Sequence, residues 1–107
     1  MDDVQMLVVI VPAEIRDDVV DTLIALEPIS GFNLTRIAGF SREHSHFSLR
    51  ERVEGHREMY RFEVLHENAQ QEILLQALEP VCALARARYW ILPLSGQGHF
   101  GIPGSDR

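Results

Sequence analysis

An α+β domain with the element order β-α-β-β-α-β is the fold class that this sequence predicts, and three observations indicate it. Residues 6–11 are continuously apolar and rich in β-branched side chains, which is typical of a strand covered on both faces. Two stretches, 13–26 and 68–81, repeat apolar residues at helical spacing. Residues 58–66 alternate between apolar and charged side chains, as a strand with one buried face does.

The first half of the chain predicts a strand, a helix and a second strand. In the helix at 13–26, acids in the first turns complement the helix dipole. Its apolar positions are Ile15, Val19, Val20, Leu23, Ile24 and Leu26. Proline and glycine in 27–31 end the helix, because proline cannot continue the hydrogen-bond ladder. The second strand is then expected at 33–40.

The second half predicts a strand, a helix and a final strand. Asn68 with Gln71 indicates a capping box that opens the helix, and Pro80 should kink or restart it. The expected buried stripe of this helix is Ile73, Leu74, Ala77, Leu78 and Val81. The last strand is expected at 89–94, where Pro93 stops it.

This order of elements predicts a ferredoxin-like arrangement. Two right-handed βαβ units form a four-stranded antiparallel sheet with both helices on one face. The strands at 6–11 and 89–94 are apolar on both sides, so the helix-free face should be too apolar for water. We therefore expect other subunits to cover that face.

Composition limits the class of protein. A chain of 107 residues predicts one domain, 1–107, with 95–107 as a flexible C-terminal tail. Sixteen acids against ten arginines give a net charge of −6, which argues against a nucleic-acid partner. A single cysteine, Cys82, excludes an intramolecular disulfide, and the N-terminal apolar run is short and lacks a preceding basic region. We expect a cytoplasmic protein.

A long polar stretch, SREHSHFSLRERVEGHRE, interrupts the apolar pattern at 41–58. A loop of this length has no core of its own to offset the entropy of ordering it, so 41–57 is expected to be mobile. Long loops within compact domains usually carry function. The stretch is therefore expected to meet a ligand or a partner protein.

The segments LTRIAGFSR (34–42) and YRFEVL (60–65), with a polar loop between them, resemble the second and third strands of the PII-like signalling proteins. EGHREMYRFEVLHENA (54–69) paired with RYWILPL (88–94) looks closest to a small PII-like family of unassigned function whose genes often accompany heavy-metal efflux systems. The resemblance spans residues 4–95. It implies a homotrimer in which 41–57 is the T-loop, and ligand clefts lie between subunits.

The resemblance also implies a function and a set of site residues. It predicts a regulatory sensor, not an enzyme, that signals to a partner such as a membrane transporter or efflux component. The cleft residues are then Gly39, Arg42, Arg88 and His99. The sequence CALARARYW (82–90) lacks the glycines and the lysine with which PII proteins hold nucleotide phosphates, so ATP or ADP binding of that kind is not expected.

Three histidines of the polar stretch form a candidate metal site. His44 and His46 are two residues apart, which in an extended chain places both imidazoles on one side. With His56 they could bind Zn, Cu or Ni, and Glu43 or Glu54 could add an oxygen ligand. The alternative is that these residues are solvated side chains of a mobile loop.

Two other functions remain open at this stage. The first is a ligand-free assembly module whose loop docks a protein. The second is a small enzyme resembling ferredoxin-like monooxygenases, with His66 or His99 in a cavity beside the sheet. No acid pair, serine triad or phosphate-binding motif supports catalysis.

Overall fold

The computed structural model describes residues 3–40 and 56–101, and the elements occur in the predicted order. The strands and helices are β1 (Val4–Pro12), η1 (Ala13–Ile15), α1 (Arg16–Ala25), β2 (Asn33–Gly39), β3 (Arg57–Glu67), η2 (Asn68–Gln70), α3 (Gln71–Cys82) and β4 (Arg88–Pro93). The predicted α+β ferredoxin-like arrangement is therefore confirmed. The metal ligands predicted at His44 and His46 and the cleft residue Arg42 lie outside the described residues.

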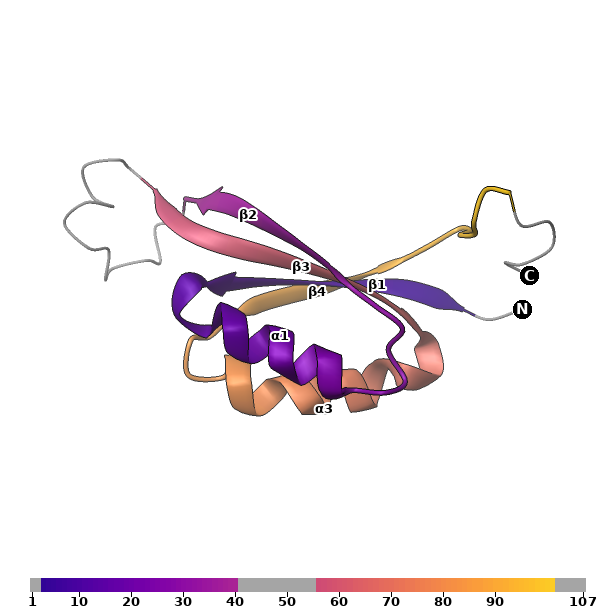
Figure 1. The fold of residues 1–107 in the computed structure, drawn as a ribbon, viewed down its shortest axis with the longest axis horizontal. Coiled ribbons are helices and arrows are strands. Elements are labelled where there is room, and N and C mark those ends of the chain that lie inside the picture. Colours follow the sequence, from indigo (N-terminus) through magenta and orange to yellow (C-terminus); the bar gives the residue numbers. More distant parts are fainter. Residues whose placement is uncertain (1–2, 41–55, 102–107) are drawn as a thin grey trace.

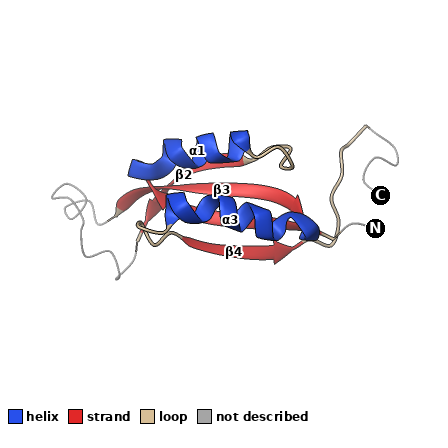
Figure 2. Cartoon of the chain, turned by 90° about the horizontal axis from the view of Figure 1, so that it is seen from below, coloured by secondary structure: helices blue, strands red, loops and turns tan. Residues whose placement is uncertain are grey.

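The four strands form one antiparallel sheet in the order β2-β3-β1-β4. Both helices lie on the same face of this sheet, below it in Figure 1 and in front of it in Figure 2. The register pairs Val9 with Phe62 on one side and with Tyr89 on the other. Within the described part of the chain, neither helix is long and apolar enough to span a membrane.

The hydrophobic core lies between the sheet and the two helices. The central strands β1 and β3 supply alternate residues, as a sheet with one covered face requires. The fully buried core side chains are Leu7, Val11, Val19, Leu23, Phe62, Val64 and Leu74. Phe32 packs against Phe62 with ring centroids 5.9 Å apart, so the segment leading into β2 also joins the core.

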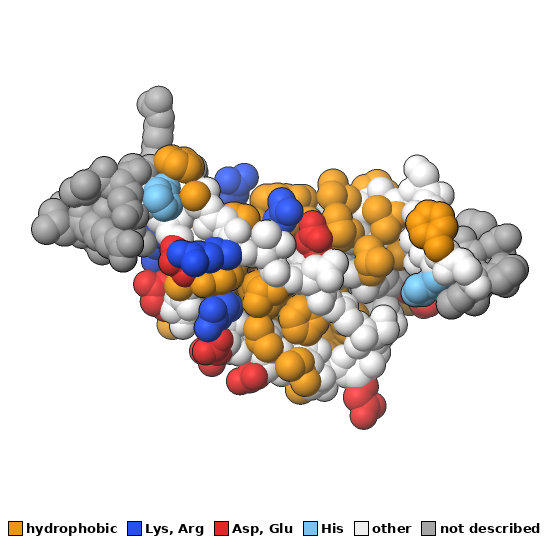
Figure 3. Space-filling model, turned by 45° about the horizontal axis from the view of Figure 1, so that its top comes forward, with side chains coloured by type: hydrophobic (Ala, Val, Ile, Leu, Met, Phe, Trp, Pro, Cys, Tyr) orange, Lys and Arg blue, Asp and Glu red, His pale blue; other side chains and the backbone are white. Residues whose placement is uncertain are grey.

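The opposite face of the sheet carries no helix, and its apolar side chains are partly exposed (Figure 3). The register places Trp90 opposite Val8 and Leu92 opposite Met6 on this face. Arg61 and Glu63 lie among them as an ion pair, with their atoms 3.6 Å apart. The helix-free face is thus largely apolar, with the Arg61–Glu63 pair near its middle and Arg88 towards the end of the sheet where β4 begins.

Three details of the second helix differ from the sequence prediction. The capping box is formed by Glu67 and Gln70, one residue earlier than expected, because the strand ends at Glu67 and the chain enters a 3₁₀ turn first. The helix continues through Pro80 to Cys82, so the proline does not interrupt it. Ile73 is exposed, because the buried face of α3 is centred on Leu74 and Leu78.

Candidate functional site

One end of the sheet brings together the ends of all four strands. β1 and β2 finish there and β3 and β4 begin there, because neighbouring strands are antiparallel. Pro12 pairs with Met59, and Gly39 pairs with Arg57. Residues 40–56 connect β2 to β3 at this end, so we call it the loop end of the sheet.

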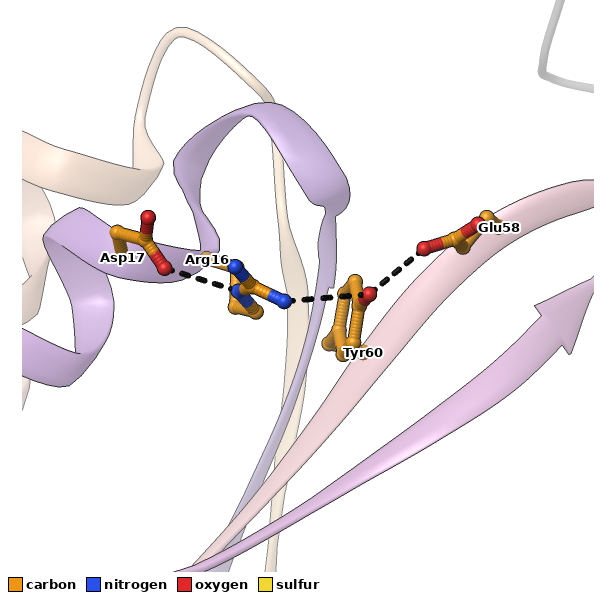
Figure 4. Close-up of polar contacts among 4 residues, drawn as sticks. All are labelled: Arg16, Asp17, Glu58 and Tyr60. Atoms are coloured by element: carbon orange, nitrogen blue, oxygen red, sulfur yellow. Dashed lines mark hydrogen bonds and ion pairs between the residues drawn. The ribbon is translucent and has the colours of Figure 1, made fainter.

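A polar network joins the first turn of α1 to β3 at the loop end (Figure 4). Arg16 donates a hydrogen bond to the hydroxyl of Tyr60 over 3.4 Å, and its guanidinium lies 5.1 Å from the centre of the Tyr60 ring. Tyr60 donates in turn to Glu58 over 2.6 Å. Asp17 accepts a hydrogen bond from Arg16 over 2.9 Å. A buried tyrosine thus holds one arginine and one glutamate in place.

Two further ion pairs extend this network to the neighbouring elements. Arg36 of β2 donates to Glu58 over 3.1 Å, so Glu58 contacts both Tyr60 and Arg36. Arg57 at the start of β3 lies 3.3 Å from Glu14 in the 3₁₀ turn after β1. The loop end therefore connects β2, β3 and the start of α1 through side chains as well as through the sheet.

Contacts within the network change the pKa values of two of its members, Glu58 and Arg16. The hydrogen bond from Tyr60 and the nearby positive charge of Arg36 lower the pKa of Glu58, although partial burial acts against them. The hydrogen bond and charge of Asp17 raise the pKa of Arg16. Both groups are thus held in their charged forms.

Gly39, one of the predicted cleft residues, has a packing role at the end of β2. A Cβ atom at this position would lie 2.5 Å from Cγ of Met59, which is closer than side-chain carbon atoms approach one another. Met59 is itself buried. The glycine lets β2 and β3 approach closely where the chain leaves the sheet.

Arg88, another predicted cleft residue, lies at the start of β4 and so at the loop end. Its guanidinium is 5.8 Å from the centre of the Trp90 ring on the helix-free face. Arg86 lies in the turn before it, in a left-handed conformation with φ of 53°. Neither arginine has an ion pair among the described residues, unlike Arg16, Arg36 and Arg57.

The turn that holds Arg86 is a Schellman motif. The amide of Ala87 donates to the carbonyl of Cys82 over 3.2 Å, and that of Arg86 donates to Ala83 over 3.0 Å. Glycine is the usual residue at the left-handed position of such a turn, because a Cβ atom is unfavourable there. An arginine at this left-handed position therefore destabilises the turn relative to glycine.

His99 lies at the opposite end of the sheet from Gly39 and Arg88, because it follows the last residue of β4. Gly39 and Arg88 therefore do not meet His99 within one chain, and Arg42 lies outside the described residues. A cleft formed by Gly39, Arg88 and His99 would need a second chain, as the resemblance to PII-like proteins implies. Their role in binding stays a prediction.

His56 is the one predicted metal ligand that the structure describes. The centre of its ring lies 5.6 Å from that of Phe40, so the residue just after β2 contacts the residue just before β3. Among residues 3–40 and 56–101, no three metal-binding side chains come close enough to hold an ion. A metal site at His44, His46 and His56 stays a prediction, since two of its members are outside this range.

His66, which the enzyme alternative placed in a cavity beside the sheet, is buried on the helix side of β3. It is only 3% exposed, and its Nδ1 lies 3.2 Å from the carbonyl oxygen of Val64. Its Nε2 and the side-chain oxygen of Gln5, the residue opposite on β1, are buried without a hydrogen-bond partner. His66 is thus enclosed by the fold.

Four members of this network were not predicted as site residues: Arg16, Arg36, Glu58 and Tyr60. The alternation in 58–66 places Tyr60 on the apolar side of the strand, which is correct for its ring but leaves out its hydroxyl. The signal that was present is the alternation of charge with a tyrosine at the start of β3. Buried tyrosines usually find a hydrogen-bond partner, and Glu58 lies two residues away on the same side of the strand.

The fold and the loop end define the class of protein: a ferredoxin-like α+β domain with an arginine-rich polar network at the base of a long β2–β3 connection. The family model described as "Protein of unknown function (DUF3240)" matches residues 1–101. The chain therefore belongs to the DUF3240 family.

Two solved structures resemble the chain. The crystal structure of a DUF3240 family protein from Shewanella baltica OS155 has a TM-score of 0.78 and 46% sequence identity, and the match covers 94% of this chain and 100% of that one. A Bacillus cereus protein related to NIF3 has a TM-score of 0.68 and 16% identity over 92% of this chain, which is 27% of that protein. At this identity the second likeness shows a shared fold alone. None of the curated proteins matches the chain.

Proposed function

We propose that the protein is a PII-like regulatory sensor that works as a homotrimer. In this proposal a small ligand or metal ion binds at the clefts between subunits, and residues 41–57 carry the signal to a partner such as a membrane transporter or efflux component. The role is binding and signalling, not catalysis. The observation that carries the proposal is the partly exposed apolar surface of the helix-free face.

Assembly through the helix-free face follows from the cost of leaving this surface in water. Trp90, Leu92 and Leu65 are each about two-fifths exposed there. Burying apolar surface is favourable by about 25 cal/mol per Å². Three copies that close over this face would remove it from water and would bring each loop end next to a neighbouring chain.

The arginines of the loop end support an anionic ligand. Arg86 and Arg88 have no acidic partner among the described residues, whereas Arg16, Arg36 and Arg57 do. A guanidinium without an internal partner is ready to accept a carboxylate or a phosphate through two hydrogen bonds. Arg88 also lies at the same end as Gly39, as a shared cleft requires.

The polar network gives a route by which binding could reach the rest of the fold. Glu58 and Arg57 begin β3 directly after the loop, and their partners lie on β2, on the 3₁₀ turn and, through Tyr60, on α1. A ligand that competes for Arg57 or Glu58 would change these contacts. Signalling then requires that the two arrangements bind the partner differently.

Thermal unfolding with a panel of ligands tests the sensing role. A ligand that binds only the folded protein raises its melting temperature, by an amount that grows with concentration. We expect a shift with at least one of the following: Zn²⁺, Cu²⁺, Ni²⁺, bicarbonate, phosphate or a nucleotide. The variant Arg88→Ala should lose the shift caused by an anion, and Gln76→Ala, a change on the exposed side of α3 and away from the helix-free face, is the control. No shift with any of these would contradict the proposal.

Calorimetry tests the metal form of the proposal separately. Replacing His44 and His46 with alanine should weaken the binding of Zn²⁺ or Cu²⁺ at least about tenfold and leave the assembly intact. His66→Gln is the control, because His66 is buried away from the loop. Unchanged affinity in the double variant would remove the metal proposal.

A further inference from the structure

The C-terminal arm, residues 95–101, extends past the end of β4 and away from the sheet (Figure 1). Phe100 on this arm is fully exposed, and His99 beside it is also exposed. Gly101 follows in a left-handed conformation with φ of 82°, which glycine adopts without strain. The arm thus presents an aromatic ring to solvent next to a turn that needs a glycine.

A pocket of about 130 Å³ that is partly open to solvent lies at the other end of β4, under the last turns of α3, and we call it the cavity. Its walls are mostly apolar, with Glu79 and Arg86 as the charged members. The residues that form it are Val9, Leu75, Leu78, Glu79, Cys82, Ala83, Arg86, Ala87 and Tyr89. Burial raises the pKa of the Cys82 thiol, so this side chain is a neutral part of the wall.

The ring of Phe100 matches this cavity in size and chemistry. Apolar cavities of about 150 Å³ accept a benzene molecule, and a phenylalanine side chain buries about 150 to 250 Å² of surface. His99, the neighbour of Phe100, would come near the rim, where Glu79 offers a carboxylate. Docking would therefore place an apolar ring against mostly apolar walls and an imidazole next to a carboxylate.

The two features lie at opposite ends of one chain. The arm follows the end of β4, whereas the cavity is lined by Tyr89 near its start and by the turn before it. The chain is elongated, with a longest dimension of 52 Å. A contact between the arm of one copy and the cavity of the next is heterologous, and such contacts close into rings when the rotation permits.

We propose that Phe100 of each chain docks into the cavity between α3 and β4 of a neighbouring copy, with His99 next to Glu79 at the rim. The partner is thus a second copy of this chain, and each cavity is complete only when another chain contributes its arm. The inference rests on the proposed assembly of several copies, to which it adds a defined contact outside the helix-free face.

Disulfide trapping tests the contact, because Cys82 is the only cysteine of the chain and lines the cavity. In the variant Phe100→Cys, docking brings the new thiol within reach of Cys82 of the neighbour. Diamide then takes two electrons and two protons from the pair and forms the bond, which requires Cβ atoms about 4 Å apart. We expect covalent multimers on a non-reducing gel that a reductant separates.

Two control variants define the result. Gln97→Cys places a thiol on the same arm but three residues away, and it should give at least about fivefold less product. Phe100→Cys combined with Cys82→Ser should give no bond to the cavity. An equal yield from Gln97→Cys, or a bond within one chain, would overturn the proposal.

Native mass spectrometry of the same samples separates this proposal from the assembly itself. Intact multimers that do not cross-link would overturn the docking of Phe100 and leave the assembly standing. Single chains at micromolar concentration would overturn both.

The reactivity of the Cys82 thiol is a second test that needs no new cysteine. If the arm covers the cavity, Phe100→Ala should speed the reaction of Cys82 with an aromatic disulfide reagent at least about fivefold, while Phe100→Leu, which keeps an apolar side chain, should change it less. Equal rates in wild type and Phe100→Ala would count against the docked arm.

Discussion

The two faces of the sheet are built from the same four strands but differ in how they are covered. On the helix side, alternate residues of β1 and β3 such as Leu7 and Phe62 are completely buried. On the helix-free side, Leu65, Trp90 and Leu92 keep 44, 39 and 42% of their surface exposed. A single chain therefore buries the apolar side chains of one face and leaves those of the other face partly exposed.

This difference in burial shows that the apolar packing that stabilises one chain is mainly on the helix side of the sheet. The helix side holds a continuous core under α1 and α3. The helix-free side buries Val8 and Met59 between neighbouring strands, but its margins stay accessible. Monomeric proteins seldom leave large contiguous apolar surfaces exposed, and the uncovered margins are therefore the basis of the proposed assembly.

Phe62→Ala should give the largest loss of stability, because it removes a fully buried ring from the helix side. The expected cost in the free energy of unfolding is about 3 to 5 kcal/mol. Leu65→Ala, a change on the helix-free side, should cost less than about 1.5 kcal/mol in the dissociated chain. Urea unfolding at low protein concentration measures both, and equal losses would remove the distinction between the faces.

Gly39→Ala should give the next largest loss of stability, because the new methyl group would collide with Met59 on the helix-free face. Overpacking of this kind costs about 1 to 3 kcal/mol. In the background Met59→Ala the same change should cost clearly less, because the obstructing Cγ atom is gone. An equal cost in both backgrounds would mean that the close contact is not the reason for the glycine.

Tyr60→Phe should lower the melting temperature by about 4 °C near neutral pH, because the hydroxyl links Arg16 to Glu58. The hydrogen bond from Tyr60 lowers the pKa of Glu58 from its ordinary value of 4.5. A carboxyl group with a lowered pKa in the folded state stabilises the fold above its unfolded pKa, and this contribution disappears as the pH falls through the folded value.

The difference between wild type and Tyr60→Phe should therefore be largest above pH 4.5 and should shrink in more acid solution. Melting curves from neutral pH to about pH 3 measure this trend. Tyr89→Phe, on the helix side of β4 and outside the network, is the control. A difference that grows towards acid pH would contradict the assigned role of Glu58.

Arg86→Gly should give the smallest change in the free energy of unfolding, and it should increase stability where the other variants reduce it. Glycine removes the cost of a left-handed residue in the Schellman turn, which is worth about 1 kcal/mol or less in increased stability. Arg86→Ala removes the same side chain but keeps the unfavourable backbone, so it should not stabilise. If both variants are equally stable, the backbone conformation is not the source of the cost.

The order of elements followed from the sequence because each one has a strong local pattern. The apolar run of β1 and the alternation in β3 give the central strands directly. Details at the ends of elements were less predictable. The capping box moved to Glu67 and Gln70, because the length of β3 depends on its pairing with β1 and not on local sequence alone.

The candidate site was predictable only in part. Gly39 was predicted as a cleft residue, and that role stays a prediction; its close approach to Met59 was not predicted, because it depends on cross-strand register. The contact of Arg16 with Tyr60 joins residues 44 positions apart in the chain. Long-range contacts of this kind depend on topology, and one sequence carries no direct signal for them.

The mass of the protein in solution tests the central claim most directly. Light scattering at micromolar concentration should give about 37 kDa, three copies of a 12.2 kDa chain, and Trp90→Glu combined with Leu92→Glu should reduce this to the mass of one chain. A wild-type protein that stays at 12.2 kDa while remaining folded and monodisperse would show that the helix-free face needs no partner.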